Sequence, residues 1–205
     1  MAPTQPTGDN IDLPSAAAQF RPAPGPEVIA AIQQYAFGSA DWLYDLNFAD
    51  QEPWQGDVLP DASVAYVDGA GDIVVIDGPV MLLSTSCDAV PGRNKPVATV
   101  APVFTVSSFL DDLSQGQRTS KGQALRENRY SNIFYLPSVE GMSEQYVNFS
   151  YAGPVSTDWL AGHCSKCDPH DRLRLSQNGW YVLMMKLAAH YTRSEQVGDP
   201  PRRES

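Results

Sequence analysis

Hydrophobic residues in the middle of the chain occur in short runs rich in β-branched and aliphatic residues. From Trp54 to Val106 the runs are GDVLP, ASVAYVDG, DIVVIDG, PVMLLSTS and VATVAPVFTV, and Gly, Asp and Pro separate them. Runs of this kind, bounded by turn residues, are typical of β-strands. NIFYLPS and QYVNFSYAGPV repeat the pattern later in the chain. The pattern therefore indicates a small, mainly antiparallel barrel or sandwich over residues 54–160.

Three other segments show helical features. PEVIAAIQQYAFG carries its apolar residues on one face of a short helix that begins at Pro26. Residues 107–129 are predicted to be a helical insertion in two short pieces, broken at Gly116 and Gly122. In the 172–193 segment, GWYVLMMKLAAHYTR is apolar on most faces, so we expect this helix to be covered. The predicted fold is mainly β with added helices, an α+β protein.

These patterns predict one folded domain with appendages. The predicted parts are a disordered arm at 1–26, a helical covering segment at 27–53, a domain at 54–193 that includes the helical insertion at 107–129 and a Cys/His loop at 162–171, and a polar tail at 194–205.

The charge and the cysteine content restrict the function classes. The formal net charge of the 205 residues is −10, whereas a nucleic-acid binder needs Lys and Arg for phosphate contacts. The chain has no apolar run of about 18 residues to span a membrane. It begins without the basic and apolar regions of a secretory signal, and three cysteines do not make a disulfide scaffold. These features predict a cytoplasmic protein.

Three motifs in order resemble the MazF/PemK toxin family. They are QGDVLP, then DIVVIDGPVMLLSTSCD with VATVAPVFTV, and finally RLRLSQNGWYVLMMKLAAHY. The resemblance covers residues 54–191 and implies a small SH3-like barrel with a C-terminal helix. It also implies a homodimer in a toxin–antitoxin pair, and the active members of the family cut single-stranded RNA without a metal.

The two functional positions of the family carry other residues here. The family arginine before the Pro-Val strand corresponds to Gly78, and the family threonine corresponds to Phe104. Thr105 follows one step along, which on a strand is the opposite face. The nearest replacement for the arginine is Arg93. We therefore predict a partner-binding or regulatory component of a toxin–antitoxin or phage-defence system, without standard ribonuclease activity and with a protein partner, either an antitoxin or a defence component.

The alternative is a sequence-specific endoribonuclease toxin with relocated catalytic residues, for which RNA is the partner. Its candidate catalytic residues are Arg93, Thr105 and Asp88. Such chemistry needs a cation at the scissile phosphate and a group that transfers protons.

The residues after PVMLLS are candidates for a partner or substrate groove. Thr85, Cys87 and Asp88 lie where this buried strand leaves the core, which in the related toxins faces the groove. The alternative is that Ser84 and Asp88 only shape a turn through side-chain hydrogen bonds.

GHCSKCDPHD contains Zn²⁺-binding residue types at a suitable spacing. Cys164, Cys167 and His170 form a C-x-x-C-x-x-H set, which is a three-ligand set for one structural zinc. His163, Cys87 or a carboxylate would supply the fourth ligand. The alternative is a polar loop with a reduced cysteine pair and no metal.

The terminal helix predicts a homodimer. Met184, Met185 and Leu187 give it more apolar surface than one face of a barrel covers. The alternative cover is the segment 27–48 folding back over this helix.

Overall fold

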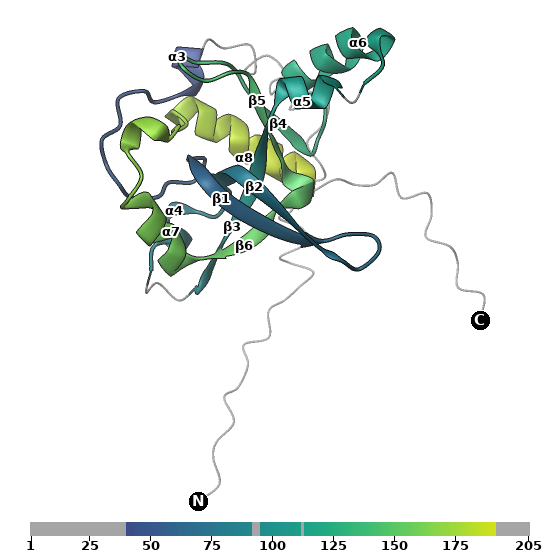
Figure 1. Ribbon diagram of the computed structural model, residues 1–205. Helices are drawn as coiled ribbons and strands as arrows, with labels where there is room; N and C mark the ends of the chain where they lie inside the picture. Colours follow the sequence, from purple (N-terminus) through teal and green to yellow (C-terminus); the bar gives the residue numbers. More distant parts are fainter. Residues whose placement is uncertain (1–39, 92–94, 112, 192–205) are drawn as a thin grey trace, which may run out of the picture.

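The computed structural model describes residues 40–91, 95–111 and 113–191, which form a six-stranded antiparallel sheet with helices packed around it (Figure 1). The predicted arm at 1–26, the start of the covering segment at 27–39, Arg93 and the tail at 194–205 lie outside the described residues. The strands are β1 (Val58–Val67), β2 (Ile73–Leu82), β3 (Val97–Thr105), β4 (Ile133–Leu136), β5 (Gln145–Asn148) and β6 (Gly153–Ser156).

The central strand of the sheet is β3. It pairs with β2, with β5 and with β6, and the main path of the sheet runs β1-β2-β3-β5-β4. The sheet curls so that Gly153 of β6 lies against Val64 and Ala65 of β1. No pairing among the described strands closes the sheet into a barrel. The predicted mainly β fold with added helices is confirmed, and its strands form a curled sheet that stays open.

The run PVMLLS is strand, as predicted, and β2 ends at its Leu82. Side chains of a strand point alternately to opposite faces. Met81 packs in a cluster with Leu183 of the terminal helix, whereas Val80 and Leu82 pack in a second cluster with Leu160. This part of β2 therefore lies between two cores, which explains why its sequence is apolar without alternation.

The helices connect and cover the strands (Figure 1). They are α3 (Ala40–Leu43), α4 (Ser86–Ala89), α5 (Val106–Asp111), α6 (Gln115–Arg126), α7 (Thr157–Cys164) and α8 (Gln177–Tyr191), with 3-10 turns at Phe149–Tyr151 and Pro169–Asp171. Among the described residues, no helix is both long and apolar enough to cross a membrane.

The predicted insertion at 107–129 does form two helical pieces, but the predicted break points are wrong. α5 ends at Asp111 and α6 runs through both Gly116 and Gly122. A Cβ at Gly122 would lie 3.0 Å from Leu110 Cδ2. This glycine therefore allows α6 to approach α5 closely and does not end the helix.

The terminal helix α8 packs on the sheet, and the segment before β1 packs on α8. Leu43 and Tyr44 share a buried cluster with Leu183 and Leu187. A side chain at Gly179 would collide with the carbonyl oxygen of Leu43, so the contact between α3 and α8 requires glycine there. The described part of the covering segment thus lies over α8. This is the cover that the sequence analysis gave as the alternative to a homodimer.

Candidate functional site

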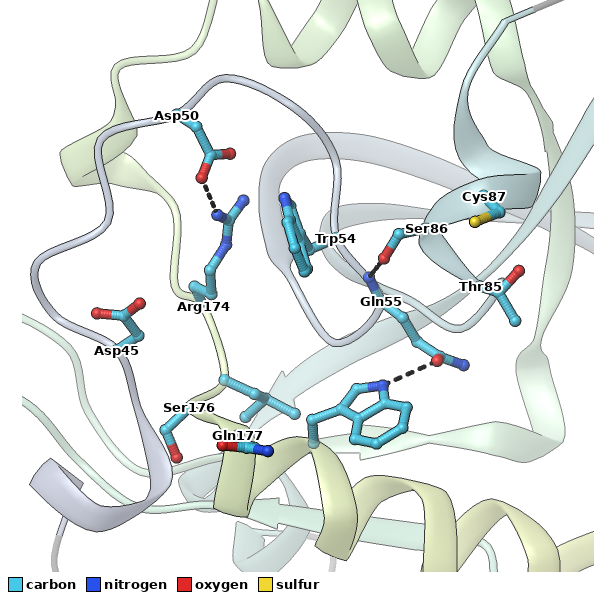
Figure 2. Close-up of a pocket in the computed structure, with 12 residues that line it drawn as sticks. Asp45, Asp50, Trp54, Gln55, Thr85, Ser86, Cys87, Arg174, Ser176 and Gln177 are labelled. Atoms are coloured by element: carbon cyan, nitrogen blue, oxygen red, sulfur yellow. Dashed lines mark hydrogen bonds and ion pairs between the residues drawn. The ribbon is translucent and has the colours of Figure 1, made fainter. Parts of the chain in front are cut away.

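A pocket with a volume of about 690 Å³ lies between three segments. These are the loop before β1, the turn after β2 and the start of α8 (Figure 2). The pocket is lined by Asp45, Asp50, Trp54, Gln55, Thr85, Ser86, Cys87, Arg174, Leu175, Ser176, Gln177 and Trp180. Aromatic and polar side chains thus meet in one concave site, as is usual for small-ligand sites.

A glycine turn brings the first wall of the pocket into place. Gly56 has a φ of +93°, and its N–H donates to the carbonyl of Leu82 over 2.8 Å. A Cβ here would lie 2.7 Å from Leu175 Cδ1, and this positive φ is strained for residues other than glycine. The turn sends the chain into β1 and leaves Trp54 half exposed at the pocket.

Gln55 holds the two sides of the pocket together. Its Nε2 donates to the Leu83 carbonyl over 2.6 Å, and its Oε1 accepts from Trp180 Nε1 over 2.9 Å. Its backbone N–H donates to Ser86 Oγ over 3.1 Å. Gln55 is 9% exposed and its bond to the Leu83 carbonyl is buried, where polar groups need partners, whereas the other two bonds are partly buried. The side chain therefore fixes the Trp180 indole relative to the turn after β2.

Behind the pocket lies a buried cluster of one carboxylate and two guanidinium groups. Asp57 Oδ2 accepts from Arg172 Nη2 over 2.5 Å, and Asp57 Oδ1 accepts from Arg174 Nε over 2.8 Å. The side chains of Asp57 and Arg172 have no exposed area. In RLRLS the two arginines alternate with Leu173 and Leu175, which face the core. Alternation thus places both guanidinium groups on one side of an extended segment.

Most of the donors of Arg174 are used within this cluster. Besides the bond from Nε, Nη1 donates to Asp50 Oδ2 over 2.6 Å, and Nη2 donates to Asp57 Oδ2 and to the Glu52 carbonyl, each over 2.9 Å. The guanidinium carbon lies 4.3 Å from the Phe48 ring centre and 5.4 Å from that of Trp54. Burial lowers the pKa of Arg174, but hydrogen bonds to Asp57 and Asp50 outweigh it and raise the pKa above its usual value.

The predicted groove residues divide between the pocket and its surroundings. Thr85 and Cys87 line the pocket, on the side opposite to Arg174 in Figure 2. Asp88 is not among the lining residues; its Oδ2 accepts from Lys95 Nζ over 2.7 Å at the surface. The hydrogen bond from Lys95 lowers the pKa of Asp88. Ser84 Oγ accepts from the Thr99 N–H over 2.7 Å, so this side chain binds strand β3 and not the backbone of its own turn.

The candidate catalytic residues are not brought together in the described part of the chain. Thr105 Oγ1 accepts from the Ser108 N–H over 3.2 Å, so it caps the start of α5. Asp88 pairs with Lys95, which lies just before the first residue of β3. Thr105 is the last residue of β3, so the two candidates lie near opposite ends of this strand. A straight strand of this length spans roughly 26 Å. Arg93, which would complete the set, lies outside the described residues.

The two positions that correspond to the family's arginine and threonine have other roles. Gly78 pairs with Ala62 in the β1–β2 ladder at a φ of +146° and offers no side chain. The Phe104 ring lies 5.5 Å from that of Tyr146 and 6.3 Å from that of Tyr151, in an aromatic cluster. Neither position can supply a cation or a proton-transfer group.

The Cys/His loop does not assemble the predicted zinc ligands. Cys164 is buried in the second core cluster, and burial raises the pKa of its thiol to about 11. His170 is exposed. Cys167 Sγ lies 3.4 Å from His163 Nε2, but the same nitrogen lies 2.7 Å from the Pro60 carbonyl oxygen. Within the residues that the structure describes, no three or more His, Cys, Asp or Glu side chains are arranged to hold a metal ion.

Several residues of the pocket were not identified from the sequence, namely Trp54, Gln55, Arg174 and Trp180. One signal was available for Arg174. Two arginines that alternate with leucines in an acidic chain need a buried acidic partner, and the Gly-Asp before β1 supplies it.

Comparison with protein-family models, with curated proteins and with solved structures found no match to this chain. The resemblance to the MazF/PemK family therefore stays a prediction from the sequence motifs.

Proposed function

We propose that this chain is a partner-binding or regulatory component of a toxin–antitoxin or phage-defence system and lacks standard ribonuclease activity. The observation that carries the binding part is the pocket lined by Trp54, Trp180, Thr85 and Cys87. Tryptophan in a concave, partly apolar site is typical of binding surfaces. The setting rests on the three sequence motifs that resemble the MazF/PemK family.

The chemistry of the pocket supports binding over RNA cleavage. The only arginine among its lining residues, Arg174, already donates to Asp57, Asp50 and the Glu52 carbonyl. It is therefore not free to stabilise charge on a scissile phosphate, which the reaction requires.

We also propose that the protein forms a homodimer through α8. Tyr181 and Tyr191 are 52% and 66% exposed on this helix. Tyr181 also lines a second hollow of about 280 Å³, together with Trp42 and Met185 among others. Exposed aromatic residues beside a hollow are typical of protein interfaces.

A photoactivatable cross-linker attached to Cys87 tests the binding function. Cys87 is exposed and lines the pocket, and a Cys167→Ser background removes the half-buried second thiol. In an extract of cells that produce the protein, we expect a protein adduct that is lost in Trp54→Ala. The control carries the cross-linker at Ala70→Cys, in the exposed β1–β2 turn, with Cys87→Ser. An adduct that Trp54→Ala leaves unchanged, or one that contains only RNA, would contradict the proposal.

We expect the purified protein to leave single-stranded RNA uncleaved. The reason is that Gly78 and Phe104 replace the family's arginine and threonine, and that Thr105 caps a helix. The measurement is gel analysis of a labelled RNA incubated with the parent protein, with Arg93→Ala and with Thr105→Ala. Each incubation is done with and without a chelator. Robust cleavage in the presence of chelator that disappears in Arg93→Ala would establish the endoribonuclease alternative.

A further inference from the structure

The charged groups around the pocket leave it negative. Asp45 and Asp50 line the pocket together with Arg174, and Asp57 and Arg172 lie directly behind Arg174. Three carboxylates against two guanidinium groups give a net charge of −1. Figure 2 shows both lining carboxylates on the same side of the pocket as Arg174. A ligand that enters here therefore meets a surplus of negative charge.

An anionic ligand finds one cationic donor group among the lining residues of this site, and most of it is already used. Four of the five N–H groups of Arg174 are used by the bonds to Asp57, Asp50 and Glu52 described above. A phosphate beside this guanidinium would also approach the Asp50 carboxylate, whose charge repels it. The site thus disfavours the backbone of a nucleic acid.

A cation with an apolar stem meets complementary groups. The Asp45 carboxylate is exposed, and its Oδ1 accepts from the Asn47 N–H over 3.2 Å. The Asp50 side chain is 49% exposed and Trp54 is 50% exposed. Indole rings attract cations over their faces, and the aliphatic part of a long basic side chain packs along apolar surface. Trp180 and Leu175 supply such surface.

We propose that the pocket binds the side chain of an arginine or lysine that a protein partner presents. The inference rests on the proposed partner-binding function and names the chemistry of the partner. In this arrangement the basic group lies beside Asp45 and Asp50, with its stem against Trp54 and Trp180. The net charge of −10 attracts a basic partner at long range and speeds its encounter with the pocket.

Two short peptides test this inference with the full chain. One is acetyl-Gly-Gly-Arg-Gly-Gly-amide; the other replaces arginine by citrulline, which has nearly the same shape and no charge. The indole N–H signals of the ¹⁵N-labelled protein report binding, because Trp54 and Trp180 line the pocket and Trp159 does not. We expect the arginine peptide to shift the Trp54 and Trp180 signals and to leave that of Trp159 unchanged. The citrulline peptide should bind at least about tenfold more weakly.

A matched pair of charge variants locates the interaction. Asp45→Asn removes one exposed carboxylate at the pocket, and Asp72→Asn removes one in the β1–β2 turn. We expect Asp45→Asn to weaken binding of the arginine peptide about three- to tenfold, and Asp72→Asn to change it less than twofold. Equal effects of the two variants would contradict the inference.

Other outcomes separate the inference from the proposed function. Equal binding of the citrulline and arginine peptides would overturn the inference, as would an oligouridylate that shifts the Trp54 signal when the arginine peptide does not. If Cys87 still captures a protein through Trp54, the binding function stands and only the cationic ligand is wrong. If Cys87 captures no protein, the binding function fails whatever the peptides do.

Discussion

Asp57→Asn is expected to lower the free energy of unfolding by about 3–5 kcal/mol, because it removes the buried carboxylate that pairs with two buried guanidinium groups. The Asp57 and Arg172 side chains have no exposed area, and that of Arg174 is 8% exposed. Asparagine keeps one oxygen, but its NH₂ group would face N–H donors of the arginines. The loss is a large part of the 5–15 kcal/mol that is typical of a folded domain. Denaturant unfolding measures it.

Asp50→Asn is the matched control for this prediction. Asp50 pairs with the same Arg174 over 2.6 Å, but its side chain is 49% exposed. Exposed ion pairs contribute up to about 1 kcal/mol, so this variant should remain close to the parent protein. If Asp57→Asn is as stable as Asp50→Asn, the buried cluster is not a main determinant of the stability of this fold.

The same cluster connects stability with the pocket. The Trp54 N–H donates to Asp57 Oδ2 over 3.0 Å, so the carboxylate that pairs with both arginines also holds the backbone of a pocket residue. A ligand that binds to Trp54 therefore contacts a wall that is fixed from inside the protein. Such preorganisation reduces the cost of ordering the site when a ligand binds.

The strands were predictable from the sequence because their signal is local. β3 coincides with one predicted run, whereas β1 and β2 each join two runs that the sequence separated, at Pro60-Asp61 and at Gly78-Pro79. The terminal helix was predictable for the same reason, since its apolar residues recur at helical spacing. What the local pattern does not contain is whether the sheet closes into a barrel or stays open, as it does here, because this depends on contacts between strands distant in the chain.

The break in the helical insertion shows how a tertiary contact overrides a local signal. Glycine lowers helix propensity, so the local sequence predicts breaks at Gly116 and Gly122. Gly122 is instead buried where α6 meets Leu110 of α5, and the break falls between Asp111 and Gln115. Only the packing of the two helices explains this placement.

The candidate site was half predictable. Thr85 and Cys87 follow a strand that the sequence identifies as buried, so their arrival at a surface could be inferred. Trp54 and Trp180 come from segments more than 100 residues apart, and no spacing rule relates them. In the Cys/His loop, by contrast, a local spacing rule predicts a site that the structure does not assemble. Its spacing suits zinc, but the turn of helix α7 that carries Cys164 faces the core.

Gln55→Leu is expected to lower the free energy of unfolding by about 2–4 kcal/mol and to loosen the pocket. Leucine has a similar size but leaves the Leu83 carbonyl and the Trp180 indole N–H without the partner that Gln55 provides. A buried polar group left unpaired costs about 1–3 kcal/mol, which applies to the Leu83 carbonyl, and the loss of the partly buried bond to the indole N–H adds to it. Thermal or denaturant unfolding gives the stability, and the indole N–H signal of Trp180 gives the state of the pocket.

Gln177→Leu is the matched control, because Gln177 lines the same pocket but is exposed. It should change stability by less than about 0.5 kcal/mol. A double-mutant cycle with Trp180→Phe isolates the bond between Gln55 Oε1 and Trp180 Nε1, since phenylalanine removes the donor. We expect Gln55→Leu to cost less in the Trp180→Phe background, by about 1 kcal/mol. Equal costs in both backgrounds would mean that this bond does not hold the two walls of the pocket together, and that Gln55 contributes mainly through the Leu83 carbonyl.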